Sequence, residues 1–306
     1  MKKFALTSQE IADFRKNGFA GPFDLYEADE IIEKYKHIRA KLFDRSNAIY
    51  DLPVDSVIAG YDRHFDVDEL SEHIMRREIV DKVEGILGPD VICWRSEMFP
   101  KYPGDAGTDW HQADTFGGPS GGTPHIVWPM NSEFGGALTV WTALTEVTEK
   151  NGCLRFIPGT HEEMFFDESK GMEYDPNKNA SEVREGMKRA FFGYDYRNMQ
   201  KDPDWVPDEA DAVSMEMKAG QFVIFWSTLM HSSFPNSTTN QTRMATACRY
   251  LPSSVAVYPG VSQLEEFGSS VSLDKFGVVT VAGESHNNQN KIAKQSATGY
   301  EFALAE

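Results

Sequence analysis

The sequence predicts a single, mainly β domain, a sandwich or barrel, that follows a group of N-terminal helices. Three observations support this class. Helical periodicity is confined to about the first 89 residues, short strand-like segments separated by turns follow it, and no repeat or low-complexity linker divides the 306 residues. With 41% hydrophobic and 12% aromatic residues, the chain can form a sizeable core.

The N-terminal part is expected to supply helices that pack against a sheet. Thr7-Ser8-Gln9-Glu10 matches a capping box, and the helix that it opens should end at Asn17-Gly18. Apolar residues at nearly helical spacing predict a second helix at about 29–43 and further helix over 67–87, which Gly88-Pro89 ends. We expect these helices to carry no chemistry.

After residue 89 the hydrophobic period becomes that of strands. Asn151-Gly152 predicts a hairpin turn between two of them. The polar stretch at about 162–210 has little periodicity and indicates a long insertion, whereas 265–306 indicates peripheral strands and a tail. The remaining strand-like segments are 91–99, 136–144, 213–225 and 243–258.

Charge and cysteine content restrict the partners and the compartment. The net charge is −17 without a basic stripe, which argues against nucleic acid. No apolar run reaches the roughly 20 residues of a membrane helix, and the N-terminal residues do not resemble a secretory signal. Cys93, Cys153 and Cys248 are widely spaced in apolar segments, which is typical of reduced core cysteines in a cytoplasmic protein.

Two histidines are the candidate metal ligands. His111 lies in the apolar, aromatic stretch Thr108–Phe116, and His231 lies in a similar context much later in the chain. A lone histidine in such a setting is more often structural, so this alternative stays open. The open site of a non-haem iron oxygenase uses two histidines and one carboxylate, and the carboxylate is missing here.

Residue 113, two positions after His111, is where that carboxylate would stand. On a strand both side chains would point to the metal side, but Ala113 offers only a methyl group. The nearest acid, Asp114, faces the opposite way on a regular strand and could reach a metal only through a bulge. The pattern therefore predicts a coordination position that the protein leaves empty.

Two arginines that follow His231 predict an anion site. Arg243 and Arg249 are six residues apart and share one face of a strand, with the small Ala245 and Ala247 between them. Guanidinium groups beside small residues suit a cavity that binds a carboxylate. The alternative is an exposed edge strand with solvated arginines, which the apolar residues between them disfavour.

The run His111-Gln112-Ala113-Asp114-Thr115-Phe116 resembles the motif of non-haem iron, 2-oxoglutarate-dependent halogenases of the phytanoyl-CoA dioxygenase family. The similarity is to members that act on aminoacyl groups tethered to carrier proteins, of the syringomycin threonine halogenase type. It extends over nearly the whole chain and includes Phe99–Gly104, Phe156–Thr160 and Phe191–Tyr196. The segment beyond about residue 265 is less similar.

The resemblance implies a double-stranded β-helix, a cupin-like jelly roll, in one domain over residues 1–306. The helical part would cover about 1–89, the β-helix core about 90–260 and a peripheral segment about 261–306. His111 and His231 would bind Fe(II), and chloride would occupy the position beside Ala113. Further implied roles are halide binding by Phe116, Thr139, Ser227 and Arg249, 2-oxoglutarate binding by Thr108, Trp141 and Arg243, and a substrate pocket with Glu97 and Phe116.

The implied activity is chlorination of an unactivated aliphatic carbon of an amino acid held on a phosphopantetheinylated carrier protein, in nonribosomal peptide-type antibiotic biosynthesis. The implied cofactors are Fe(II), 2-oxoglutarate and chloride, with O₂ as co-substrate. The amino acid would be of the threonine, 2-aminobutyrate, valine or leucine type. Two alternatives remain: a hydroxylase with Asp114 or water as third ligand, and a binding homologue without catalysis.

Overall fold

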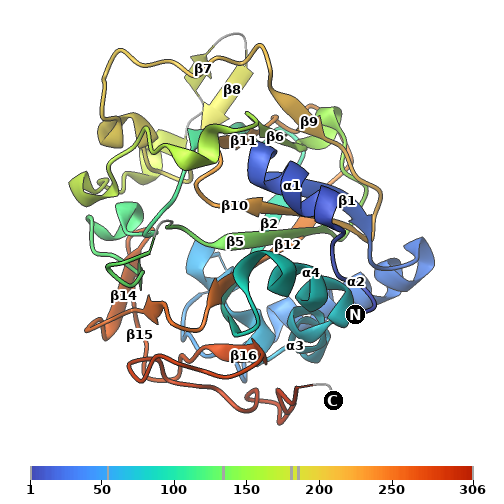
Figure 1. Ribbon diagram of the computed structural model, residues 1–306. Helices are drawn as coiled ribbons and strands as arrows, with labels where there is room; N and C mark the ends of the chain where they lie inside the picture. The colour runs from blue at the N-terminus through green and yellow to red at the C-terminus, as the bar shows by residue number, and fades with distance from the viewer. Residues whose placement is uncertain (1, 54, 133–134, 180–181, 185–186, 305–306) are drawn as a thin grey trace.

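Two sheets that pack face to face form the centre of the protein, in a computed structural model that describes residues 2–53, 55–132, 135–179, 182–184 and 187–304 (Figure 1). The first sheet is antiparallel, in the order β1-β10-β5-β12-β2-β16. Its strands are β1 (Phe19–Asp24), β2 (Val91–Lys101), β5 (Leu138–Ala143), β10 (Gln221–Trp226), β12 (Arg243–Pro252) and β16 (Val279–Ala282). This architecture confirms the predicted jelly-roll fold class.

The second sheet has the order β7-β8-β3-β11-β6-β9, and one of its pairs, β3 with β8, is parallel. Its strands are β3 (Gly107–His111), β6 (Leu154–Phe156), β7 (Glu182–Arg184), β8 (Met187–Ala190), β9 (Val213–Met215) and β11 (His231–Ser233). Two small two-stranded sheets join β4 (Ile126–Val127) to β13 (Ala256–Val257) and β14 (Gln263–Glu266) to β15 (Ser269–Ser272).

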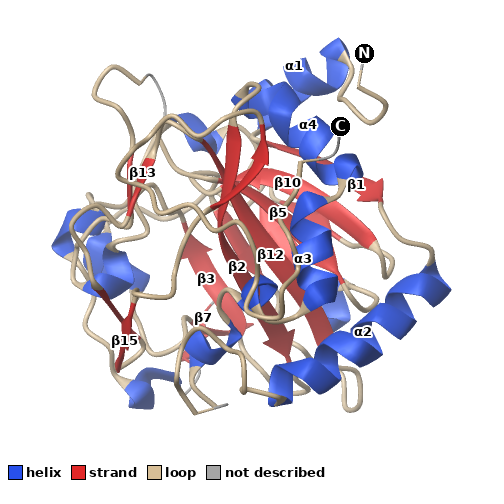
Figure 2. Cartoon of the chain, turned by 90° about the horizontal axis from the view of Figure 1, so that it is seen from below, coloured by secondary structure: helices blue, strands red, loops and turns tan. Residues whose placement is uncertain are grey.

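Four α-helices accompany the first sheet: α1 (Ser8–Asn17), α2 (Ala28–Phe43), α3 (Asp68–Met75) and α4 (Arg77–Leu87) (Figures 1 and 2). The predicted capping box is present at Thr7 and Glu10, and Gly18 ends α1 at a φ of 82°. The helix predicted over 67–87 is wrong in one respect. It is two helices, because Arg76 is extended, with φ −60° and ψ 130°.

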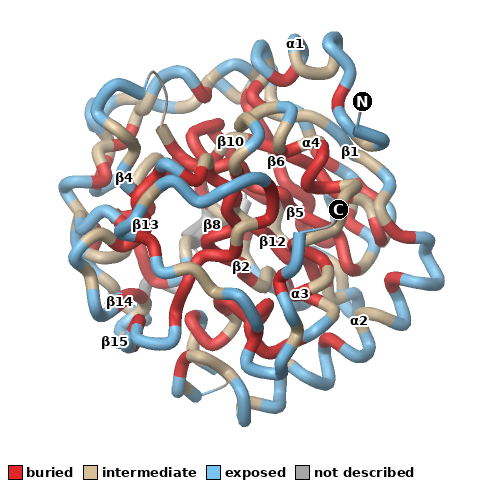
Figure 3. Tube along the Cα trace, turned by 60° about the horizontal axis from the view of Figure 1, so that its bottom comes forward, coloured by how far each residue is buried: buried red, intermediate tan, exposed pale blue. Residues whose placement is uncertain are grey.

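The outer face of the first sheet packs on these helices. Leu138 and Val140 of β5 are fully buried with Ile74 of α3 and with Val80 and Val83 of α4. The inner face meets the second sheet in another buried cluster, which includes Trp141, Ala245 and Phe156. The central strands consequently form the most buried part of the trace (Figure 3). No helix in the described ranges is long and apolar enough to cross a membrane.

The hairpin predicted at Asn151-Gly152 is wrong. The two residues do turn the chain, since Thr148 and Asn151 cap each other and Gly152 has a φ of 98°. However, β5 before the turn belongs to the first sheet and β6 after it belongs to the second. The turn therefore carries the chain across the sandwich rather than back along a neighbouring strand.

Two regions predicted as accessory contribute to the core of the fold. Within the polar 162–210 insertion, β8 extends the second sheet beside β3, the strand that ends at His111. The C-terminal segment adds β16 to the edge of the first sheet next to β2. In addition, Glu266 at the end of β14 is buried and lines the central cavity, so this segment is not only peripheral.

Candidate active site

The sheet register brings the two candidate histidines together. His111 ends β3, His231 begins β11, and these residues are direct partners in the antiparallel pair. Their ring centroids are 4.0 Å apart. The adjoining turns hold this arrangement, because Ala113 donates its N–H to the Ser227 carbonyl at 2.8 Å. Residues distant in sequence thus form one pair at the centre of the second sheet.

Both imidazoles present the same nitrogen to the cavity. Nδ1 of His111 donates to the Asp109 carbonyl at 2.7 Å, and Nδ1 of His231 donates to the Leu229 carbonyl at 2.7 Å. A carbonyl can only accept, so the proton is on Nδ1 and Nε2 keeps its lone pair. Burial lowers the pKa of His111 to about 4, and burial with repulsion from His111 lowers the pKa of His231 well below its usual value. Both rings are neutral near pH 7, the form that binds a metal.

Among the described residues, no third protein ligand accompanies the histidines. Within the described part of the chain, no group of three His, Cys, Asp or Glu side chains could hold a metal. Ala113 lines the cavity with its methyl group. Asp114 is not among the lining residues, and its carboxylate accepts the N–H of Thr115 at 2.7 Å. The donor set therefore fits a transition metal with open positions, as in the non-haem iron class.

One end of the cavity carries two buried cations. Arg243 and Lys101 are partners across β12 and β2, and both are buried. Burial lowers the pKa of Arg243 to about 10, and burial with repulsion from Arg243 lowers the pKa of Lys101 well below its usual value. Neither side chain forms an ion pair with any described residue, so this end is complementary to an anion.

Hydroxyl and aromatic groups complete this anion-binding end. Lys101 donates to Ser233 Oγ at 2.8 Å, and that hydroxyl is hydrogen-bonded in turn to Thr108 Oγ1. The Arg243 guanidinium lies 5.2 Å from the centre of the Trp141 ring, and its buried Nε has no hydrogen-bond partner among the described groups. These groups suit a carboxylate, which accepts from cations and hydroxyls together.

At the other end, Arg249 connects three of the predicted site residues. Its Nε donates to Glu97 Oε2 at 2.7 Å, and its Nη1 donates to Thr139 Oγ1 at 3.0 Å. The guanidinium also lies 4.8 Å from the centre of the Phe116 ring. Arg249 is thus held between a carboxylate and a hydroxyl, beside the pair of histidines.

Ser227 fixes the position of Ala113 through a hydrogen bond to its backbone. Its Oγ donates to the Ala113 carbonyl at 2.6 Å and accepts the Ala137 N–H at 2.8 Å. Gly136 lies directly against this contact at a φ of 83°, where a Cβ would come within 2.8 Å of Ser227 Oγ. Only glycine fits there, because any side chain would displace the hydroxyl that orients Ala113.

All of the residues predicted for the site line one cavity of about 900 Å³. They are Glu97, Thr108, His111, Ala113, Phe116, Thr139, Trp141, Ser227, His231, Arg243 and Arg249. Sequence reasoning missed many other lining residues, among them Arg95, Lys101, Glu168, Ser233 and Glu266. A buried lysine inside a strand was a possible signal for Lys101, but Glu168 and Glu266 reach the cavity from segments that show no periodic pattern.

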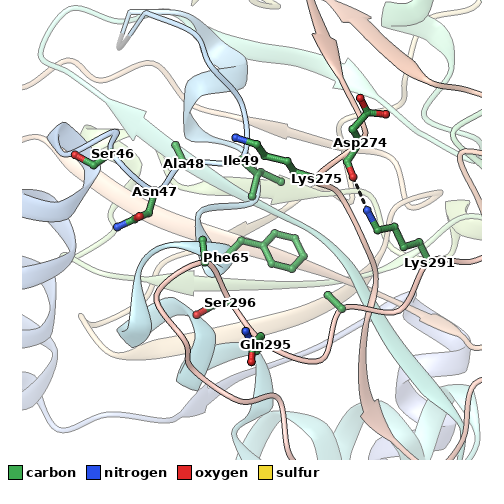
Figure 4. A pocket seen from close by; sticks show the side chains of 12 residues that line it. Ser46, Asn47, Ala48, Ile49, Phe65, Asp274, Lys275, Lys291, Gln295 and Ser296 are labelled. Atoms are coloured by element: carbon green, nitrogen blue, oxygen red, sulfur yellow. Dashed lines mark hydrogen bonds between the residues drawn. The ribbon is translucent and has the colours of Figure 1, made fainter.

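A second cavity of about 550 Å³ lies between residues 46–49 and the C-terminal segment (Figure 4). Its lining includes Phe65, Gln295 and Ser296. The Lys291 ammonium donates a hydrogen bond to the Asp274 carbonyl. None of the predicted site residues reaches it. The chemistry therefore belongs to the larger cavity.

Comparison with known proteins places this geometry in a family. The model of the phytanoyl-CoA dioxygenase (PhyH) family matches residues 14–245. The chain belongs to the phytanoyl-CoA dioxygenase family. This membership confirms the predicted enzyme class, a non-haem iron and 2-oxoglutarate-dependent oxidoreductase.

A curated relative, the probable alpha-ketoglutarate-dependent hypophosphite dioxygenase of Stutzerimonas stutzeri, is 30% identical over 104 residues, and the match covers about a third of each chain (34% and 32%).

Among solved structures, this chain is similar to "CytC3 with Fe(II) and alpha-ketoglutarate". The TM-score is 0.77 at 39% identity, and the match covers 98% of each chain. It is also similar to the non-haem monooxygenase ThoJ, with a TM-score of 0.62 at 19% identity over 96% of this chain and 90% of that one. The second likeness shows the fold alone.

Proposed function

We propose that this enzyme is a halogenase, which chlorinates an unactivated aliphatic carbon of a carrier-bound amino acid. The observation that carries the proposal is the pair of neutral histidines with a methyl group, Ala113, where a hydroxylase would have a carboxylate. The extended similarity to CytC3, whose structure contains Fe(II) and alpha-ketoglutarate, supports the same cofactors here.

We assign the cofactor contacts from the two ends of the cavity. Nε2 of His111 and of His231 would hold Fe(II), and Arg243 with Thr108 and Trp141 would hold the far carboxylate of 2-oxoglutarate. Lys101 supports this end through Ser233. When bound, iron, 2-oxoglutarate and O₂ supply the oxidising power that removes a hydrogen atom from the substrate carbon, and chloride supplies the atom that replaces it.

The protein's own contribution is to shape and charge the halide position. Ala113 leaves the space, Phe116 and Ser227 bound it, and Arg249 supplies a positive charge. Glu97 neutralises part of that charge and holds the guanidinium in place. A preorganised charge in a buried site stabilises an anion far more than the same charge in water.

The partner that fits the cavity is a carrier protein with a phosphopantetheine arm. The cavity extends from the histidines to the C-terminal half of α2, where Arg39 and the exposed Phe43 (69%) form its rim. A cation and an aromatic ring at the rim suit the phosphate of the arm and a protein surface around it. Cys93, Cys153 and Cys248 are free and buried, which agrees with a cytoplasmic location.

The decisive experiment is incubation with Fe(II), 2-oxoglutarate, O₂ and chloride, with a panel of aminoacyl carrier proteins followed by mass spectrometry. The panel covers threonine, 2-aminobutyrate, valine and leucine. We expect one member to gain chlorine and the corresponding free amino acids to react poorly. A product that is hydroxylated and never chlorinated would identify a hydroxylase. Absence of succinate formation with every substrate would identify a binding homologue.

A further inference from the structure

Glu168 reaches the turn after His111 from a distant part of the chain. It begins the short 3₁₀ segment Glu168–Lys170 in the polar insertion, is only 4% exposed, and lines the same cavity as the histidines. Its Oε2 accepts three successive backbone N–H groups, from Asp114 at 3.1 Å, Thr115 at 2.6 Å and Phe116 at 3.0 Å. The Thr115 hydroxyl donates to the same oxygen at 2.8 Å.

This convergence shapes the turn that carries Phe116. Phe116 has a φ of 60°, in the left-handed region that is unfavourable for residues other than glycine. Three N–H groups that point at one acceptor hold the backbone in that conformation. The Phe116 ring then lies against Arg249, at 4.8 Å, and against Trp94, at 5.2 Å between ring centroids.

The same turn continues directly from Ala113, which Ser227 holds. Ser227 holds the carbonyl and the N–H of Ala113, and Glu168 holds the next three N–H groups. The methyl of Ala113 and the ring of Phe116 are two boundaries of the proposed halide position. Glu168 is therefore the acceptor that holds the backbone between these two boundaries.

The segment that carries Glu168 is itself anchored. Asp167 donates its N–H to the Met199 carbonyl at 2.7 Å, and Met172 donates to the Gly118 carbonyl at 2.9 Å. The Asp167 side chain accepts the Ser169 N–H at 3.1 Å and so caps the 3₁₀ turn. A side chain on a fixed segment can position a turn, whereas one on a free loop cannot.

We propose that Glu168 is a positioning residue for the halide: it holds the 114–116 turn so that Ala113 and Phe116 enclose chloride. This inference rests on the proposed halogenase function. It assigns to the polar insertion a specific role, because the residue that shapes the halide position comes from the insertion and not from the β-helix core. Removal of Glu168 should weaken chloride binding and shift the product from chlorinated towards hydroxylated.

The test compares Glu168→Ala, Glu168→Gln and Thr115→Val with an exposed control from the same insertion, Glu163→Gln. Chloride is titrated into the anaerobic protein with Fe(II) and 2-oxoglutarate, and the charge-transfer absorption of the chelate is followed. The affinity for 2-oxoglutarate is measured in parallel. Product ratios are then determined on the aminoacyl carrier protein that the wild type chlorinates.

For Glu168→Ala we expect the chloride dissociation constant to rise by about tenfold or more, since the one acceptor of four hydrogen bonds is lost. Thr115→Val removes one of the four donors and should raise the chloride dissociation constant by about threefold. Glu168→Gln keeps an acceptor oxygen, so its chloride dissociation constant should lie between those of the alanine variant and the wild type. Affinity for 2-oxoglutarate should stay within about twofold in all variants, because its predicted contacts are at the other end of the cavity.

Two results would overturn the inference, and they are distinguishable from a failure of the proposed function. In the first, Glu168→Ala keeps the wild-type chloride affinity and product ratio. In the second, the Glu168→Ala variant loses 2-oxoglutarate affinity as much as chloride affinity. Glu168 would then support the whole cavity and not the halide position in particular. If the wild type itself neither responds to chloride nor chlorinates any carrier, the proposed function fails and this inference fails with it.

Discussion

The two faces of the six-stranded sheet bury different kinds of side chain, although the same strands supply both. On β5, Leu138 and Val140 point outward and pack among the apolar residues of the helices. Thr139 and Trp141 point inward to the cavity, beside two arginines of β12. The outer face is apolar, whereas the inner face contains two charged groups, Arg243 and Lys101, that form no ion pair with any described side chain.

Buried histidines show the same difference. His73, on the helix side, has a partner for each ring nitrogen, the Tyr26 hydroxyl at 2.8 Å and the Thr142 hydroxyl at 3.2 Å. His111 and His231 have one hydrogen-bonded nitrogen each and turn the other into the cavity. Burial alone therefore does not identify a ligand. A buried group with unused binding capacity that lines a cavity does.

The strongest test of the inner face is Ala113→Asp. A carboxylate at this position would fill the space proposed for chloride, so chlorination should be abolished. Mass spectrometry of the carrier-bound product measures the effect, and Ala113→Gly, which leaves the position open, is the matched control. Chlorination by the aspartate variant at the wild-type rate would show that chloride binds elsewhere.

The next largest effect is expected for Arg243→Met. Loss of the buried guanidinium should weaken 2-oxoglutarate binding by on the order of 10²-fold, measured by anaerobic titration. The free energy of unfolding of the ligand-free variant should stay within about 1 kcal/mol of the wild-type value, because the buried arginine has no ion-pair partner among the described residues. Arg15→Met, on the exposed side of α1, is the control.

On the outer face, Ile74→Ala should lower the free energy of unfolding by about 3 kcal/mol, since Ile74 is fully buried in the helix–sheet cluster. Chloride and 2-oxoglutarate affinities of the folded variant should not change. Urea unfolding gives the stability, and Ile32→Ala, at 45% exposure on α2, should cost less than about 1 kcal/mol. A large loss of cofactor affinity in the Ile74 variant would contradict the separation of the two faces.

The smallest effect concerns pH. Burial lowers the pKa of His64 and of His73 to about 3, whereas an unfolded histidine titrates near 6.5. Between these values the unfolded chain binds more protons, so stability decreases as the pH falls from about 6.5 towards 3. Each group contributes up to about 1.4 kcal/mol per pH unit in this window.

His73→Gln should therefore reduce the slope of unfolding free energy against pH by about that amount between pH 6 and pH 4. Ile32→Ala, an exposed change on α2 that removes no titratable group, is the control and should leave the slope unchanged. Equal slopes in the wild type and the His73 variant would mean that this histidine is protonated in the folded protein.

Local sequence patterns predicted those parts of the fold that local forces determine. The capping box at Thr7 and the alternation of Arg243 to Arg249 on β12 are both present in the structure. The separation of the two sheets at Asn151-Gly152 was not predictable, because a turn motif specifies a change of direction but not the partner of the next strand.

Some residues of the candidate site could likewise be predicted from the sequence, and others could not. The two histidines, Ala113 and the two arginines stand in a recognisable motif or on an alternating strand, so sequence reasoning found them. Glu168 could not be found, since its contact with residues 114–116 joins segments more than fifty positions apart and leaves no periodic trace. Its acceptor role follows only from the folded backbone.

The position of β16 has a consequence for handling the protein. This strand covers the edge of β2, and Phe302 after it packs into the helix–sheet cluster. A truncation before Val279 would leave Val91–Cys93, the start of β2, without a strand partner on that side. Such an edge can recruit the same strand from another molecule. Shortened variants should therefore precipitate or form oligomers.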